Sequence, residues 1–474
     1  MKVRILVLLL FLSASAFAQE KASVSNLRKV VEVLAADSLR GRAYKSKELL
    51  VAQRYISEQF KQVGLKPIGS SFIQSVEWHD QYGGELKISN IVGVIEGNDP
   101  VLKNEYIVVG AHYDHVGYSA DKDTVIYNGA DDNASGVSGI IELSRIILAS
   151  GAKPDRSILI VAFDAEEAGL VGSRKFVENS PVPLKSIKAM LSIDMIGHAN
   201  LIKGLEIAGV GSLKDLDIPQ SLFTATDSLR VKLRSNPSFR INHTDTQSFF
   251  KKGISNLYVN TGLKANYHKP TDDANTLDYT GMAFAVDNIT SLVLYLAKQP
   301  TLHYTNPIPR LAVGVAASFG TNHFKMMNGP IDNKAMLTYS AGISVLYKAW
   351  KKASVNADIL FKNKTSRTEL GQVNMPSLYI PVHLVLINPY NTARFFAGVG
   401  PYYSYSFGRY VKGDKLKLSN RERDDYGLDI MMGCVVMKNQ IAFHSTYGLK
   451  RLMDNQPLMH YRSFEISFTR YLRY

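Results

Sequence analysis

The chain has 474 residues, a formal net charge of +13 and a single cysteine, Cys434. Its length predicts two or more domains, its 46% hydrophobic content is ordinary for a globular protein, and one cysteine excludes an intramolecular disulfide or a cysteine-based metal or redox site. The basic excess lies in residues 301–474, with 22 Lys and Arg against 10 Asp and Glu. We interpret this excess as solvated loop and pore charge, because no nucleic-acid motif accompanies it.

The N-terminus has the pattern of a secretory signal peptide. Lys2 and Arg4 precede an apolar run at residues 5–12, and small residues ending at Ala18 offer a cleavage site. The apolar run is too short for a stop-transfer helix. No cysteine follows the cleavage site, so we expect no lipoprotein anchor. We therefore expect residues 1–18 to be removed and the mature chain to lie outside the cytoplasm.

The next part of the chain predicts an α/β domain. Residues 24–63 have the spacing of two amphipathic helices separated by a polar break at 37–42. Alternating segments at 72–78 and 86–95 predict strands. From about 106 to 296, strand and helix patterns alternate, which predicts a mixed, largely parallel sheet covered by helices.

Apolar strands in this region end in residues that can bind metal. The residues concerned are His112 and Asp114, Glu166 and Glu167, and Asp194, while Asp132 lies just before a predicted helix. An open α/β sheet collects its site residues at these strand ends. Taken singly, each has a plainer interpretation, such as a surface histidine, a helix cap or a solvated acidic pair. Together, imidazoles and carboxylates without cysteine predict a hydrolase site for Zn²⁺ or a similar divalent ion.

The order of these motifs resembles the zinc aminopeptidases of the M28 peptidase family, over about Leu27 to Leu296. The motifs that carry the resemblance are His112-Tyr113-Asp114, Gly129-Ala130-Asp131-Asp132-Asn133-Ala134-Ser135-Gly136, Phe163-Asp164-Ala165-Glu166-Glu167-Ala168-Gly169-Leu170, Ile193-Asp194-Met195 and Tyr267-His268-Lys269-Pro270. The segments Leu39-Arg40-Gly41-Arg42 and Asn90-Ile91-Val92-Gly93 also resemble secreted members of that family.

The resemblance implies a centre for two zinc ions, although cobalt or manganese would accept the same ligands. His112 and Asp194 would hold one ion. Glu167 and His268 would hold the other. Asp132 would bridge the two.

The resemblance also implies roles for residues that do not bind metal. Glu166 would be the general base that activates the shared water and later protonates the leaving amine. Asp114 would orient His112, and Tyr267 would hydrogen-bond the developing oxyanion. We interpret His115 as a neighbour of the site and not as a ligand.

Beyond residue 300 the helical periodicity ends, and segments of about ten residues alternate apolar with small or polar residues. The alternation predicts an antiparallel β-barrel of about eight strands, near 311–319, 336–348, 352–362, 377–388, 394–408, 426–437, 439–449 and 463–474. Loops are expected at 372–376 and 411–425. This alternation of apolar with small or polar residues resembles the small outer-membrane barrel domains of secreted Bacteroidetes proteins. A soluble β-sandwich is the alternative, since its strands also alternate.

The sequence therefore predicts a signal peptide at 1–18, a metallopeptidase domain at 19–300, a linker at 301–309 and a barrel at 310–474. The expected function is removal of N-terminal residues from peptides by an enzyme exported across the inner membrane. We expect the barrel to anchor it in the outer membrane with the peptidase facing the periplasm, and expect neither nucleic acid nor an obligate protein as partner. Carboxypeptidase or glutaminyl-cyclase chemistry, or a non-catalytic peptide-binding module, are the alternatives.

Overall fold

The structure is a computed structural model that divides into two compact units, Met1–Pro307 and Ile308–Tyr474. It describes residues 20–79, 85–119, 125–235, 243–263, 266–305, 311–326, 335–350, 353–368, 371–387, 393–411, 414–416, 423–436, 439–449 and 459–473. The predicted signal peptide at 1–18 lies outside the described residues and stays a prediction.

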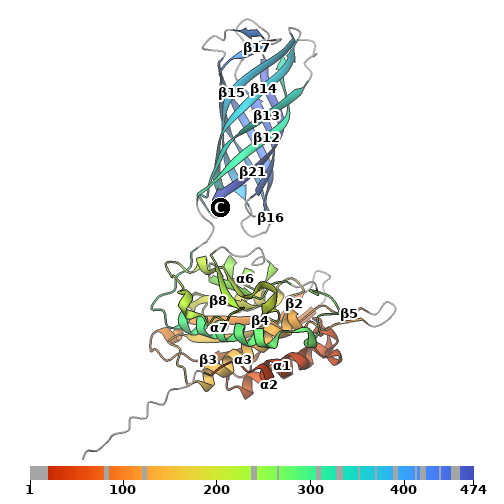
Figure 1. Ribbon diagram of the computed structural model, residues 1–474, viewed down its shortest axis with the longest axis vertical. Helices are drawn as coiled ribbons and strands as arrows, with labels where there is room; N and C mark the ends of the chain where they lie inside the picture. Colours follow the sequence, from red (N-terminus) through yellow and green to blue (C-terminus); the bar gives the residue numbers. More distant parts are fainter. Residues whose placement is uncertain are drawn as a thin grey trace, which may run out of the picture. The chain divides into compact units, whose positions relative to one another are not determined.

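The first unit is built on a nine-stranded mixed sheet (Figure 1). The strand order is β1-β3-β7-β4-β8-β11-β9-β10, and β2 also pairs with β3. The bounds are β1 Lys66–Pro67, β2 Ile73–His79, β3 Glu85–Ile95, β4 Tyr106–His112, β7 Ser157–Phe163, β8 Ile187–Ile193, β9 Gly204–Ala208, β10 Arg230–Arg234 and β11 Ser255–Asn260. The central strands β7, β4, β8 and β11 run parallel, whereas β3 joins β7 antiparallel. The predicted fold class is confirmed.

Helices cover both faces of this sheet, because alternate strand residues point to opposite sides. In β4, Ile107 and Val109 pack into one hydrophobic core and Val108 into the other. The helices of the first core are α1 (Val24–Leu34), α2 (Lys47–Gln62), α3 (Gly136–Ala149) and α7 (Tyr279–Ala297). Those of the second are α4 (Val171–Glu178) and α6 (Thr246–Lys251).

The ends of these helices follow from local chemistry. Ser23 and Ser46 each accept a hydrogen bond from a backbone N–H in the first turn of α1 and α2. Gly64, at a φ of 93°, follows the end of α2 in the left-handed region that favours glycine. The helix α7 is long and apolar enough to cross a membrane, but 67% of that stretch is buried, and it packs against α3 as a core helix.

The predicted linker at 301–309 begins inside the first unit. Leu302 is buried in the first core, and the ring of Tyr304 lies against that of Phe250 at an edge-to-face angle of 73°. The backbone N–H of Thr305 donates to the carbonyl of Ser212. An apolar and an aromatic residue thus tie residues 301–305 to the domain that precedes them.

The second unit is a closed antiparallel barrel, as predicted. Its strands are β12 (Leu311–Met326), β13 (Met336–Tyr347), β14 (Ala353–Thr368), β15 (Gly371–Ile387), β16 (Ala393–Ser406), β19 (Asp424–Val436), β20 (Asn439–Gly448) and β21 (Met459–Arg473). Each pairs with its neighbours, and the pairing of β14 with β15 closes the ring of eight strands.

Two expected loops are wrong in part. Residues 372–376 belong to β15, because their backbone pairs with 363–367 of β14 and the side chains of Val373 and Met375 turn inward. Residues 411–425 overlap the start of β19 and the short hairpin of β17 (Arg409–Val411) and β18 (Asp414–Leu416). In both segments, polar residues that are typical of loops lie in strands, because their backbone pairs with that of a neighbouring strand.

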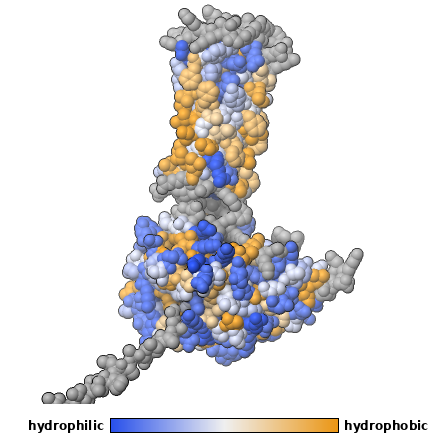
Figure 2. Space-filling view, in the orientation of Figure 1, coloured by the Kyte–Doolittle hydropathy of each residue, from blue (hydrophilic) through white to orange (hydrophobic). Residues whose placement is uncertain are grey.

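The barrel strands have an apolar outer face and a polar inner face. The apolar side chains on the visible face of the barrel appear in Figure 2. Exposed outward residues include Val315, Ile343, Ile359, Phe361, Leu384, Leu386, Val399, Met432, Phe443 and Phe468. Inside, Lys362 pairs with Glu465 and Lys364 with Asp425, each at 2.5 Å between nitrogen and oxygen. Side chains thus fill the interior, as is usual for eight strands.

Candidate metal centre

The predicted site residues meet at one edge of the first unit's sheet. His112 is the last residue of β4, Glu166 and Glu167 follow β7, Asp194 follows β8 and His268 lies beyond β11. Because these four strands are parallel, their carboxyl ends lie at the same edge. Asp132 reaches them from an irregular turn, Ala130–Ser135, that precedes α3.

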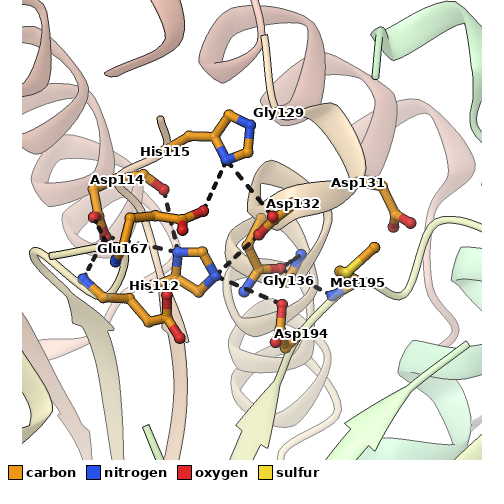
Figure 3. A network of polar contacts seen from close by, with 12 residues as sticks. His112, Asp114, His115, Gly129, Asp131, Asp132, Gly136, Glu167, Asp194 and Met195 are labelled. Atoms are coloured by element: carbon orange, nitrogen blue, oxygen red, sulfur yellow. Dashed lines mark hydrogen bonds and ion pairs between the residues drawn. The ribbon is translucent and has the colours of Figure 1, made fainter. Parts of the chain in front are cut away.

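Six side chains, the five predicted ligands and His115, form two overlapping sets of ligand atoms. Figure 3 shows His112, Asp132 and Asp194 of the first set. In the first, Nε2 of His112 lies 3.2 Å from Oδ1 of Asp132 and 3.6 Å from Oδ1 of Asp194. In the second, Nε2 of His268 lies 3.1 Å from Oδ2 of Asp132 and 3.0 Å from Oε1 of Glu167. Asp132 therefore gives one carboxylate oxygen to each set, and all five predicted metal ligands come together.

The spacing of these atoms suits zinc. Zinc–oxygen and zinc–nitrogen bonds of about 2.0–2.2 Å in a tetrahedron place neighbouring ligand atoms roughly 3.3–3.5 Å apart. The observed separations of 3.0–3.6 Å match this range within a few tenths of an ångström. Three carboxylates also meet in one largely buried place, where a divalent cation would balance their charge. The residues present therefore fit the metal.

The carboxylates and imidazoles of the site shift each other's protonation. Burial alone would raise the pKa of Asp132, but His112, His115 and His268 hold it below its usual range. Burial would lower the pKa of His268, but Asp132 and Glu167 raise it to about 10. His268 thus holds its proton strongly while Asp132 stays ionised, so a metal ion must displace the imidazole proton when it binds.

Asp114 holds the turn that carries both glutamates. Its Oδ1 accepts the backbone N–H of Glu166 at 2.9 Å, and its Oδ2 accepts that of Glu167 at 3.2 Å. Nδ1 of His112 lies 3.2 Å from the backbone oxygen of Asp114 and 3.7 Å from its carboxylate. With Nδ1 donating to that backbone oxygen, Nε2 of His112 is the nitrogen that faces the ligand set and would bind the metal.

Glu166 and Tyr267 lie beside the ligand sets without belonging to them. Burial raises the pKa of the Glu166 carboxyl, the imidazole of His112 opposes the shift, and Glu167 adds to it. The Tyr267 ring is 40% exposed and stacks on His268, with 3.8 Å between ring centroids. A carboxyl of raised pKa next to a metal centre is suited to proton transfer.

The backbone around the ligands is fixed by residues that the sequence did not single out as functional. The Asp272 carboxylate accepts the backbone N–H groups of Asp131 and Asp132. The buried guanidinium of Arg42 donates to the carbonyls of Tyr113 and Gly129. In the sequence, only the motif Leu39-Arg40-Gly41-Arg42 pointed to Arg42. That motif did not predict which groups the Arg42 side chain contacts.

His115, which the sequence placed beside the site, lies within the second set. Its Nδ1 is 3.1 Å from Oε1 of Glu167 and 3.7 Å from Oδ2 of Asp132 (Figure 3). All four donor atoms of the set, from His115, Asp132, Glu167 and His268, lie within 4.8 Å of one another. The only sequence signal was its position three residues after His112 in the same turn.

The fold and these ligand sets define a metal-dependent hydrolase of the α/β class. Residues 90–293 match peptidase family M28. The protein YfbL of Escherichia coli (strain K12) is 30% identical over 222 residues, which cover 40% of this chain and 67% of that protein. Leucine aminopeptidase 1 of Coccidioides posadasii (strain C735) is 28% identical over 205 residues, covering 42% of this chain and 50% of that protein.

A solved aminopeptidase from Aneurinibacillus sp. strain AM-1 overlays with a TM-score of 0.44 and 17% identity, covering 62% of this chain and 98% of that one. The chain spans 67% of the length of YfbL. It spans 42% and 39% of the length of two further curated relatives, from Pyrenophora tritici-repentis and Pyrenophora teres f. teres. The chain belongs to peptidase family M28, and the two Pyrenophora relatives are named probable zinc metalloproteases.

Proposed function

We propose that this peptidase is an aminopeptidase that uses two zinc ions to release N-terminal residues from peptides. The observation that carries the proposal is Asp132, whose two carboxylate oxygens each belong to a different ligand set. A carboxylate that offers one oxygen to each set would hold two ions close together, as in paired catalytic sites. Relatives named leucine aminopeptidase support the proposal that the enzyme acts at the N-terminus of a peptide and not at its C-terminus.

The chemistry divides between the cations and three side chains. Paired divalent cations supply Lewis acidity and lower the pKa of the attacking water. Glu166 takes the proton of that water on its carboxylate and returns it to the leaving amine. Tyr267 lies next to His268 in sequence and space, where its hydroxyl can donate to the developing oxyanion. Asp114 keeps both glutamates in place through their backbone N–H groups.

The experiment compares three versions of one peptide with the zinc-loaded full-length protein. We expect free N-terminal residues from the unblocked and the C-amidated peptide, and none from the N-acetylated peptide. Release from the C-terminus would favour a carboxypeptidase, and cyclisation of N-terminal glutamine without hydrolysis would favour a glutaminyl cyclase. A protein with both ions bound that cleaves no peptide in a broad panel would be a binding module. Each of these three results contradicts the proposal.

We also propose that the chain is exported and that its barrel lies in the outer membrane. The apolar outward residues and the closed ladder support this, because a bilayer accepts a barrel only without unpaired strand edges. At the end where β12 begins and β21 finishes, consecutive strands are 2–5 residues apart in sequence. At the other end three of the four separations are 9–17 residues, and the fourth, between β14 and β15, is two. Short turns are typical of the periplasmic side, which supports a peptidase facing the periplasm.

A charge on the outer face tests the membrane proposal. Ile359 lies mid-strand in β14, is 55% exposed and pairs with Ile343 of β13. Ile359→Lys should destabilise the barrel in phospholipid vesicles by about 2–4 kcal/mol, because the bilayer centre excludes the ammonium. Urea titration of the full chain, followed by the gel shift of the folded barrel, measures the change.

The matched control is Leu50→Lys in α2, at a position 53% exposed on the peptidase surface. Its effect on the unfolding of the peptidase unit should stay within about 0.5 kcal/mol. If Ile359→Lys costs no more than the control, the outer face of the barrel contacts water and the membrane proposal is wrong.

A further inference from the structure

We propose that His115 is a metal ligand, so that the second set holds its zinc ion with four protein donors. The other three are Asp132, Glu167 and His268. This inference rests on the proposed two-zinc centre and adds a residue to it. His115 binds through Nδ1, which is the atom that faces the set.

Four of the six separations between the donor atoms are close to those expected in a tetrahedron. Nδ1 of His115 lies 3.1 Å from Oε1 of Glu167 and 3.7 Å from Oδ2 of Asp132. The two edges from His268 to the same oxygens are 3.1 and 3.0 Å. These values bracket the roughly 3.3–3.5 Å expected between ligand atoms around tetrahedral zinc. The two imidazole rings meet edge to face, at 75° with 5.5 Å between centroids, so they approach the oxygens from different directions.

The backbone and the ring of His115 are both held in place. Its N–H donates to the carbonyl of Arg42 at 3.2 Å, and a β-bridge joins it to Ala43. Gly129, at a φ of 59°, lies against the ring, where a Cβ would be only 2.5 Å from Cδ2 of His115. The Arg42 side chain fixes the carbonyl of Gly129 in turn. The segment around Arg42, which the catalytic roles leave unexplained, therefore positions this histidine.

The extra donor makes the two ligand sets unequal. The set of His112, Asp132 and Asp194 has three protein donors and keeps a position for water or substrate. The set with His115 has four protein donors, so a water on its ion would be a fifth ligand. We expect the second set to retain its ion when a chelator removes the first.

X-ray absorption of the full-length protein in detergent, loaded with one equivalent of zinc, tests the proposal. The wild type should show two imidazoles per zinc and His115→Ala one. The buried His198 lies outside both sets, so His198→Ala is the matched control and should keep two. A single imidazole in the wild type, or an unchanged count in His115→Ala, would overturn the proposal.

A second variant separates ligation from simple hydrogen bonding. His115→Asn keeps an N–H donor for Glu167 but is a poor zinc ligand. If His115 ligates, this variant should bind zinc at least about 100-fold more weakly, beyond the 10–100-fold range of residues that only orient a ligand. A loss smaller than about 100-fold would mean that His115 only positions Glu167, and the proposal fails. Failure of every form to bind zinc would instead contradict the proposed two-zinc centre.

Discussion

Replacing Glu166 with glutamine should lower kcat about 10²–10⁴-fold and leave the zinc content unchanged. Glutamine has the shape of glutamate but cannot take a proton from the attacking water. Asp114 holds residue 166 through its backbone N–H, so the turn keeps its conformation in the variant. Glu166 lies outside both ligand sets, which is why the metal should stay.

The measurement pairs peptide hydrolysis with metal analysis of the same sample. Glu178→Gln at the end of α4 is the control, because that side chain is exposed and pairs only with Lys175 in the described part of the chain. The control should keep both rate and metal. If Glu166→Gln loses zinc together with activity, Glu166 is a ligand. If kcat falls less than 10-fold, another group moves the proton.

The residues at the strand ends were the part of the site that could be predicted from the sequence. Parallel strands deliver their last residues to one edge, so His112, Glu167 and Asp194 could be placed together without coordinates. His268 follows a loop after β11, and its position came from the family resemblance. The geometry brings all of them to within ligand distance of Asp132 or of each other.

The support of the site could not be predicted, because it consists of contacts between backbone groups and distant side chains. Asp272 binds the N–H groups of Asp131 and Asp132 from 140 residues away. Arg42 reaches the carbonyl of Gly129 across 87 residues. The hydrophobic periodicity of a sequence does not predict which carbonyl group a buried arginine will contact. The direction of the His115 ring could not be predicted for the same reason, since its backbone N–H donates to the carbonyl of Arg42 and its ring lies against Gly129.

In the barrel, the number of strands could be predicted and their length could not. Alternation marks a strand only where apolar and polar residues differ clearly, as in the centre of β12. Toward the ends, residues such as Gln372 and Asn374 look like a loop, yet their backbone continues the ladder with β14. Strand length is set by the partner strand, which one segment of sequence does not reveal.

Replacing Lys362 with methionine should destabilise the barrel by about 3–5 kcal/mol, because it leaves the charge of Glu465 buried without its ion-pair partner. Both side chains are nearly fully buried, and Nζ of Lys362 lies 2.5 Å from Oε1 of Glu465. The ammonium also sits 4.0 Å from the centre of the Tyr379 ring, an attraction that methionine loses. Urea unfolding of the full chain in vesicles measures the loss.

The contrast is Lys66→Met, which breaks an ion pair of similar length, 2.6 Å to Glu96, but at a position about 65% exposed. That change should cost the peptidase unit less than about 1 kcal/mol. Removing both charges of the barrel pair, in Lys362→Met with Glu465→Leu, should restore most of the lost stability, since two apolar side chains need no counter-charge. If the single and double barrel variants are equally unstable, packing and not charge makes Lys362 important. If Lys362→Met costs no more than Lys66→Met, water reaches Glu465 and the barrel interior is open.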